Sequence, residues 1–192
     1  MQQGFRRTLA ACDAVWAGNR YLAGAAARLN NHVSLLPTSI RPEKYQLEVE
    51  KPHDCLDLVW IGSSSTQKYL VQALPALEIL AQRHPQLRLK IIADFDLETR
   101  HLVTLPVAWN EETEARELAA SHIGIAPMPD NPWTRGKCAL KVLQYMAAGL
   151  PVVASPAGVN ADVVTDAENG YLSVTEDDWV NHLDDLIGDE TR

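Results

Sequence analysis

The sequence predicts an α/β fold, a largely parallel sheet with helices on both faces. The first observation is that apolar residues alternate between strand-like and helical spacing along the whole chain, which is the pattern of repeated strand–helix units. The second is that runs such as Leu56–Ile61 are nearly continuous in apolar residues, as in strands that are covered on both faces. With 192 residues, of which 46% are apolar, the chain is long enough for one well-cored domain and part of another.

The first quarter of the chain predicts only short elements. Residues 13–17 predict a strand, residues 19–29 an Ala-rich helix, and residues 33–36 a second strand that ends at Pro37. Residues 42–53 are charged, contain two prolines and show little periodicity, so they predict a linker. The chain therefore divides at this linker.

From Leu56 onward the strand–helix units become regular. The helix after the first of these strands has one apolar stripe at the helical period, made of Leu70, Leu74, Leu77 and Ala81. Further strands are predicted at 87–93, 102–107, 122–126 and 151–154. Further helices are predicted at 111–120, 137–148 and 175–187. The second part of the chain is therefore expected to hold a complete α/β domain.

The formal net charge of −8 is concentrated at the C-terminal end. Residues 160–192 hold ten acidic residues and one arginine, whereas the other 159 residues are nearly neutral, with 15 acids and 16 bases. Because neutralising phosphates along a nucleic acid needs a broad basic face, this distribution excludes a general nucleic-acid binder. The acidic final helix is expected to be a solvated face.

Cysteine usage and hydropathy indicate a cytoplasmic protein. The three cysteines are widely spaced and odd in number, which is typical of a reducing compartment and gives no structural zinc site. Asp13 and Arg20 interrupt the N-terminal segment before an export-type apolar run can form. The uncharged run at 142–161 is broken by glycines and prolines, so no transmembrane helix is expected.

A loop of small residues, Gly62 to Thr66, connects the strand at Leu56–Ile61 to the helix after it. Free backbone amides and the helix dipole favour a phosphate at such a place, and small side chains allow close approach. The spacing matches neither a dinucleotide-binding fingerprint nor a Walker A loop, because no second glycine precedes Lys68. Ser and Thr also cap helices without any ligand, so this loop by itself leaves phosphate binding and simple capping open.

Residues 130–144 carry the strongest chemical pattern. If the helix begins near Lys137, the side chains of Lys137, Lys141 and Gln144 share one face, and Arg135 lies just before the helix. The adjacent face is expected to be buried through Leu140, Leu143 and Ala147. Cations at i and i+4 repel mildly, and a helix N-terminus disfavours positive charge. An anionic ligand would explain these residues, and a solvated basic face is the alternative.

Several landmarks follow one another between residues 56 and 187. They are Trp60-Ile61-Gly62 with Lys68, Val107-Ala108-Trp109, Ile123 to Pro127, Gly136-Lys137-Cys138, Leu143 to Ser155, Gly158-Val159-Asn160 and Asn169-Gly170. In this order they resemble the C-terminal, donor-binding domain of GT-B fold, retaining-type glycosyltransferases of the large bacterial family called glycosyl transferases group 1. Residues 12–38 resemble the last strand–helix–strand of that family's N-terminal domain. The resemblance implies that residues 1–45 are the residual end of the N-terminal domain and the crossover, and that residues 46–192 form a Rossmann-like, nucleotide-sugar-binding domain.

The resemblance implies a glycosyltransferase that takes a nucleoside diphosphate sugar, with UDP as the expected carrier, as its donor. It places Gly62 and Ser63 near the diphosphate and Lys68 as a neutralising cation. It places further donor-binding residues over phosphate and ribose, namely Arg135, Lys137, Cys138, Lys141 and Gln144. The implied acceptor belongs to the cell envelope or a polysaccharide. The implied partners are a missing N-terminal acceptor domain or another chain, with peripheral membrane association of the full-length enzyme, and neither a cofactor nor a metal is expected.

The sequence departs from the family pattern at three positions. The family's two glutamates, which are separated by seven intervening residues, fall at Gly136 and Gln144, and Ser63 stands where an arginine is common. These changes remove a carboxylate expected at the donor sugar and replace a ribose-binding acceptor with an amide. The phosphate contacts are then expected to pass to Arg135, Lys137 and Lys141. No catalytic residue is assigned.

Two further features have competing interpretations. Asp94-Phe95-Asp96 has the form of the metal-binding Asp-x-Asp motif of the GT-A fold, but it follows a strand and has no partner ligand, so a turn is favoured over a metal site. Trp109 is suited to stacking on a nucleobase, although an aromatic residue at a strand end more often belongs to the core.

Two other functions stay open beside glycosyl transfer. One is a non-catalytic nucleotide-sugar-binding or interaction module left by truncation. The other is a GT-B fold nucleotide-sugar epimerase, for which the sequence offers no histidine and carboxylate site.

Overall fold

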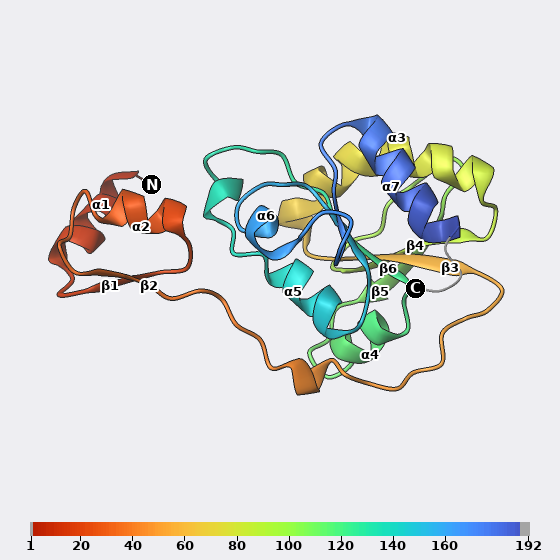
Figure 1. Cartoon of the computed structure of the whole chain (residues 1–192), viewed down its shortest axis with the longest axis horizontal. Helices are drawn as coiled ribbons and strands as arrows, with labels where there is room; N and C mark the ends of the chain where they lie inside the picture. The colour runs from red at the N-terminus through yellow and green to blue at the C-terminus, as the bar shows by residue number, and fades with distance from the viewer. Residues whose placement is uncertain (1, 189–192) are drawn as a thin grey trace.

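The structure is a computed structural model that describes residues 2–188 (Figure 1). Residues 2–36 form a small N-terminal unit, called the front unit below. Residues 56–188 form the main domain, and the segment between them crosses from one to the other. Figure 1 shows the front unit in red, joined to the main domain by the long orange segment.

The main domain is built on six parallel strands in the order β5-β4-β3-β6-β7-β8 across the sheet. The strands are β3 (Leu56–Ile61), β4 (Leu87–Ala93), β5 (Val103–Ala108), β6 (Ile123–Ala126), β7 (Val152–Ala154) and β8 (Tyr171–Leu172). The chain starts in the middle of the sheet, moves outward to β5, returns to β6 beside β3, and moves outward on the other side. This is the strand order of a Rossmann fold, so the predicted fold class is confirmed.

Helices cover both faces of the sheet (Figure 1). One face is covered by α3 (Gln67–Arg83) and α7 (Glu176–Gly188), and the other by α4 (Glu114–Ala119), α5 (Leu140–Ala147) and α6 (Asn160–Val163). Side chains alternate along β3: Leu58 and Trp60 pack in the core under α3 and α7, while Val59 and Ile61 pack in the core under α4 and α5. This two-sided burial is why the strand is nearly continuous in apolar residues.

The front unit contains one parallel strand pair and two helices. Its elements are α1 (Gln2–Ala11), β1 (Val15–Ala17), α2 (Arg20–Ala26) and β2 (Val33–Leu35), and Val15 pairs with Val33. The strand, helix and strand predicted between residues 13 and 36 are confirmed. The sequence did not predict α1, whose mean hydropathy is low.

The crossing segment is attached to the main domain at Tyr45. This residue follows a short 3-10 turn, η1 (Pro42–Lys44), and is buried among core residues of the main domain. The linker prediction for residues 42–53 is therefore wrong at Tyr45, because the aromatic side chain buries its ring and finds a hydrogen-bond partner. The proposed domain boundary after residue 45 stays a prediction.

The predicted helix at 137–148 is wrong at its start. α5 begins at Leu140, after Ala139 adopts the left-handed conformation with φ 57°, and Lys137 is extended. The left-handed residue breaks the helical register, so Lys137 does not share a helix face with Lys141. Leu140 is 50% exposed rather than buried, and the buried side chains of α5 are Val142, Gln144 and Tyr145.

Candidate functional site

The candidate site lies where the sheet reverses its order, between β3 and β6. These strands pair at two positions only, Leu58 with Ile123 and Val59 with Gly124. From its end β3 leads to α3 on one face, whereas β6 leads to α5 on the other. Such a point leaves a crevice at the carboxyl ends of the strands, which is where ligands bind in open α/β sheets.

Tyr145 of α5 fills the gap where β3 and β6 separate. Its hydroxyl accepts a hydrogen bond from the amide of Ile61 (3.0 Å) and donates one to the carbonyl of Ile125 (3.2 Å). Burial raises the pKa of Tyr145, so the hydroxyl stays protonated. Its ring packs on Gly124, where a Cβ would lie 2.4 Å from the ring Cγ. These contacts fix α5 over the ends of both strands.

The loop after β3 is fixed by packing on Trp60 and by hydrogen bonds to Asp94. Gly62 lies on the ring of Trp60, and a Cβ at Gly62 would lie 2.2 Å from the ring Cη2. The next turn, η2 (Ser64–Thr66), is held by Asp94, whose carboxylate accepts hydrogen bonds from the amide (2.6 Å) and hydroxyl (2.9 Å) of Ser64. These bonds lower the pKa of Asp94. Asp94 therefore orders the loop.

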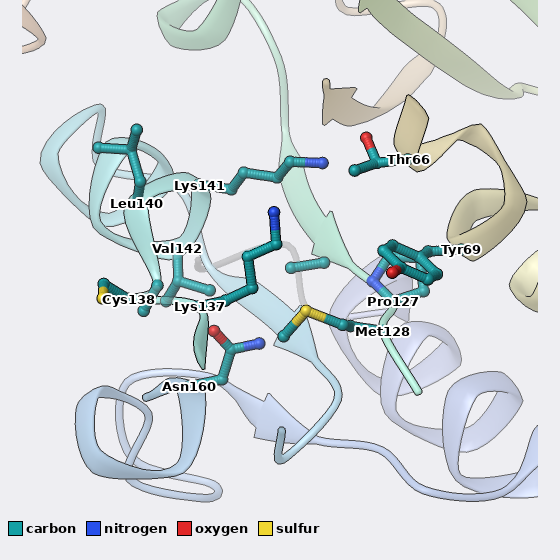
Figure 2. Close-up of a pocket in the computed structure, with 12 residues that line it drawn as sticks. Thr66, Tyr69, Pro127, Met128, Lys137, Cys138, Leu140, Lys141, Val142 and Asn160 are labelled. Carbon is teal, nitrogen blue, oxygen red and sulfur yellow. The ribbon is translucent and has the colours of Figure 1, made fainter. Parts of the chain in front are cut away.

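Two lysines of the segment after β6 point into the same space (Figure 2). The Nζ of Lys141 lies 3.9 Å from the centroid of the Trp60 ring, and the Nζ of Lys137 lies 5.5 Å from that of Trp133. Burial, together with the charge of Lys137, lowers the pKa of Lys141 from 10.5 to about 7. Within residues 2–188 neither ammonium forms a salt bridge with a carboxylate, so an anion would relieve their repulsion.

These groups line two adjoining hollows. A mostly apolar cavity of about 310 Å³ has Thr66, Asn160 and the two lysines among its lining residues. A second hollow of about 530 Å³ shares the lysines and Thr66, and its other lining residues are Ile61, Gly62, Ser63, Ser65, Asp94, Trp109, Glu114, Leu140 and Gln144. The volumes are in the range of small-molecule sites.

The structure brings most of the predicted site residues to these hollows. The larger hollow is lined by Gly62, Ser63, Lys137, Lys141 and Gln144, and the smaller one also by Cys138. Lys68 is exposed in a third hollow of about 440 Å³, which Lys137 also lines. Arg135 lines none of these hollows and instead forms a bidentate ion pair with Asp130 (2.7 and 2.8 Å). The structure thus brings six of the eight residues to the two adjoining hollows and places Lys68 in the third.

Sequence reasoning missed a buried carboxylate at the wall of the larger hollow. Glu114 Oε1 accepts hydrogen bonds from the hydroxyl of Tyr45 (2.7 Å) and the Nε2 of Gln144 (3.0 Å), and Oε2 accepts one from the indole of Trp109 (2.7 Å). Burial raises the pKa of Glu114, but the hydrogen bonds and the nearby Lys44 outweigh it and hold the pKa below its usual value. Trp109 is 53% exposed, so its interpretation as a core residue is wrong.

The described part of the chain, residues 2–188, contains no group of three or more His, Cys, Asp or Glu side chains placed to hold a metal ion. None of the helices in this same part has both the length and the apolar character that crossing a bilayer requires.

The model of one protein family, described as glycosyl transferases group 1, matches residues 56–189. This match extends over most of the chain and includes every element of the main domain. The chain belongs to the glycosyl transferases group 1 family. No curated protein sequence matches it.

Solved structures share the fold of this group 1 chain at low sequence identity. The C-terminal domain of a group 1 glycosyl transferase, LpcC, from Francisella tularensis has a TM-score of 0.57 at 18% identity, over 80% of this chain and 85% of that one. HepE from Anabaena, in complex with UDP and glucose, has a TM-score of 0.71 at 15% identity, over 98% of this chain and 58% of HepE. Sucrose-phosphate synthase from Thermosynechococcus elongatus has a TM-score of 0.76 at 17% identity, over 97% of this chain and 52% of that one. The chain therefore spans little more than half the length of the last two proteins.

Proposed function

We propose that this chain is the donor-binding half of a glycosyltransferase, which transfers a sugar from a nucleoside diphosphate sugar to an envelope or polysaccharide acceptor. The observation that carries the proposal is the convergence of the Lys137 and Lys141 ammonium groups on one hollow at the reversal point of the sheet. The structure of HepE from Anabaena, which shares the fold, was solved with UDP and glucose, and this supports UDP as the first carrier to test.

The chemistry of the proposed reaction suits the two lysines. When the bond between sugar and diphosphate breaks, the leaving nucleoside diphosphate gains negative charge. Cations fixed in a site that excludes water stabilise this charge more in the transition state than in the bound substrate. Lys141 is largely withdrawn from water, and this burial, with the nearby charge of Lys137, lowers its pKa. An arriving diphosphate raises that pKa again and restores the full charge.

The placement of the other groups favours one orientation of the donor. The amides of Gly62, Ser63 and Ser64 already donate hydrogen bonds within the protein. The side chains of this turn are small, so the diphosphate can still approach it closely. Gln144 and Glu114 lie deeper in the same hollow and offer an amide and a carboxylate to ribose hydroxyls. In this arrangement Glu114 supplies, from another helix, the acceptor that the family carries at position 144.

The acceptor half is proposed to come from a further N-terminal domain or from another chain. The front unit has only the strand pair β1–β2 in its sheet, and Trp16 on β1 is 76% exposed. Other large apolar side chains exposed on the same unit are Phe5, Tyr21, Leu35 and Leu36. An apolar surface of this kind suits a partner. We propose that the assembled enzyme works in the cytoplasm, where its three free cysteines stay reduced, with peripheral association at the membrane.

Isothermal titration calorimetry of the full chain with UDP, GDP and ADP, and with the matching nucleosides, tests the donor site. We expect one diphosphate to bind, and Lys141→Ala to weaken it far more than the nucleoside. Lys51→Ala is the control, because Lys51 lies beside His122 at the opposite edge of the sheet. Equal losses for diphosphate and nucleoside, or no binding by the folded wild type, would contradict the proposal.

The second candidate is a non-catalytic nucleotide-sugar-binding module. The observation in its favour is that the chain covers little more than half of HepE and of sucrose-phosphate synthase. Sugar transfer by the chain alone would eliminate this candidate. Donor binding with no transfer, even after an N-terminal partner is added, would support it.

A further inference from the structure

Asn19 connects the front unit to the segment that carries Lys137, residues 134–138, called the Lys137 loop below. Its Oδ1 accepts a hydrogen bond from the amide of Leu22 (2.9 Å) and so caps the start of α2. Its Nδ2 donates to the carbonyls of Arg135 (3.1 Å) and Lys137 (3.0 Å). The residue is only 6% exposed, although most of the front unit is exposed. The side-chain oxygen of Asn19 thus bonds within the front unit, and its side-chain nitrogen bonds to the main domain.

Close packing on two sides confirms that the Lys137 loop fits tightly between its neighbours. A Cβ at Gly18 would lie 2.7 Å from the Sγ of Cys138. On another side, a Cβ at Gly158 would lie 2.7 Å from the carbonyl oxygen of Thr134 and 2.9 Å from that of Lys137. A larger side chain at Gly158 would therefore displace the loop backbone, whereas one at Gly18 would displace the Cys138 side chain.

The Lys137 loop begins with a single 3-10 turn, η3 (Thr134–Gly136). After this turn Lys137 is extended, and Cys138 and the left-handed Ala139 follow before α5 begins. Two of its carbonyls are bonded by Asn19, while the Lys137 side chain points into the hollow beside Lys141 (Figure 2). Two ammonium groups that share one space repel each other, so their positions depend on how firmly the backbone is held.

We propose that Asn19 is a positioning residue for the diphosphate site. It holds the Lys137 loop from outside the main domain, so that the Lys137 ammonium reaches the diphosphate of the donor. The inference rests on the proposed donor-binding function. The front unit then has a role in donor binding. The same two hydrogen bonds of Asn19 hold the front unit against the main domain and fix the position of Lys137. Donor binding and docking of the front unit therefore strengthen each other by the same factor.

Asn19→Asp is the variant that separates this role from folding. Aspartate has nearly the same shape and is an equally good N-cap, so it keeps the bond to the Leu22 amide. It cannot donate, and it turns a carboxylate toward the two carbonyls. Asn30→Asp is the matched control: Asn30 Nδ2 also donates to two carbonyls, those of Leu9 (3.0 Å) and Cys12 (2.7 Å), and its Oδ1 accepts from the His32 amide. All of these partners lie in the front unit.

Two measurements on the full chain test the proposal. In calorimetry we expect Asn19→Asp to weaken UDP binding by roughly tenfold, the effect of losing two modest hydrogen bonds, and to leave uridine binding unchanged, while Asn30→Asp changes neither. In hydrogen exchange without nucleotide we expect faster exchange at residues 134–141 in Asn19→Asp but not in Asn30→Asp.

The outcomes separate the two proposals. If wild type binds UDP and Asn19→Asp binds it equally well, or if both variants weaken it to the same extent, Asn19 is not a positioning residue. The same conclusion follows if Asn19→Asp leaves the exchange of residues 134–141 unchanged, whether or not any nucleotide binds. If wild type binds none of UDP, GDP and ADP, the donor-binding function fails and the diphosphate role of Asn19 fails with it. Faster exchange would then show only that Asn19 holds the loop.

Discussion

Replacing Lys141 by methionine is expected to stabilise the protein and at the same time to weaken nucleoside diphosphate binding. The pKa of Lys141 falls from 10.5 to about 7 on burial beside Lys137. At about 1.36 kcal/mol per pKa unit, holding the charged lysine in the folded protein costs about 5 kcal/mol. The Trp60 ring, 3.9 Å from the ammonium, offsets about 2 kcal/mol of this. Methionine fills similar space without charge, so we expect a gain of about 3 kcal/mol in the free energy of unfolding below pH 7.

The gain in the free energy of unfolding of Lys141→Met over wild type depends on pH. Because the folded pKa lies below the unfolded one, the unfolded chain binds a proton that the folded chain binds less readily. The destabilisation by Lys141 is complete below about pH 7 and decreases as the pH rises toward 10.5, where the unfolded chain also loses the proton. The advantage of the methionine variant therefore decreases over the same range.

Urea unfolding of both proteins at about pH 6 and about pH 9 measures the effect. The control is Lys68→Met, which changes an exposed lysine and should shift the free energy of unfolding by less than about 0.5 kcal/mol. A Lys141→Met protein that is less stable than wild type at about pH 6, or that has the same gain at about pH 9, would show that the buried Lys141 charge does not destabilise the fold. In calorimetry, Lys141→Met should bind UDP with lower affinity than wild type, although its free energy of unfolding is higher.

Three further changes have expected outcomes. Glu114→Ala should lower the free energy of unfolding by about 3 kcal/mol in urea, because the buried donors lose their acceptor. Since the pKa of Glu114 is lowered, this difference from wild type should shrink as the pH falls through that pKa. A difference that does not change with pH would contradict this prediction. Gly62→Ala should cost about 1–3 kcal/mol in thermal unfolding, because its Cβ meets the buried Trp60 ring; an unchanged melting temperature would show that the ring can move aside. Asp94→Ala should free the Ser64 turn and weaken UDP binding about threefold with little change in the urea midpoint; unaltered affinity would exclude this turn from the donor site.

The order of elements in the main domain could be predicted because strands such as Leu56–Ile61 are buried on both faces, which leaves a strong apolar pattern. The start of α5 could not be predicted in the same way. Ala139 adopts a left-handed conformation that alanine rarely favours, and no local residue signals it. Residues distant in the sequence lie against this segment: the carbonyls of Thr134 and Lys137 leave no room for a side chain at Gly158.

The candidate site was predictable where its residues are close in sequence and missed where they are far apart. Lys137 and Lys141 are four residues apart, so the sequence placed them together even though the assumed helix was wrong. Glu114 lies 69 residues from Tyr45 and 30 from Gln144, and only the folded sheet brings the three together. Asn19, which is 118 residues from Lys137, has no local signature beyond that of a helix cap.

The attachment of Tyr45 limits how far the front unit can move from the Lys137 loop. Fewer than ten residues separate the end of β2 at Leu35 from the buried Tyr45 ring, and a flexible chain of that length spans about 17 Å on average. Such a tether holds the front unit near the loop at an effective concentration in the millimolar range. A contact that two separate chains would form with a Kd of about 1 mM is then made about half of the time. The two hydrogen bonds of Asn19 can therefore be individually weak and still keep the front unit in contact with the Lys137 loop for much of the time.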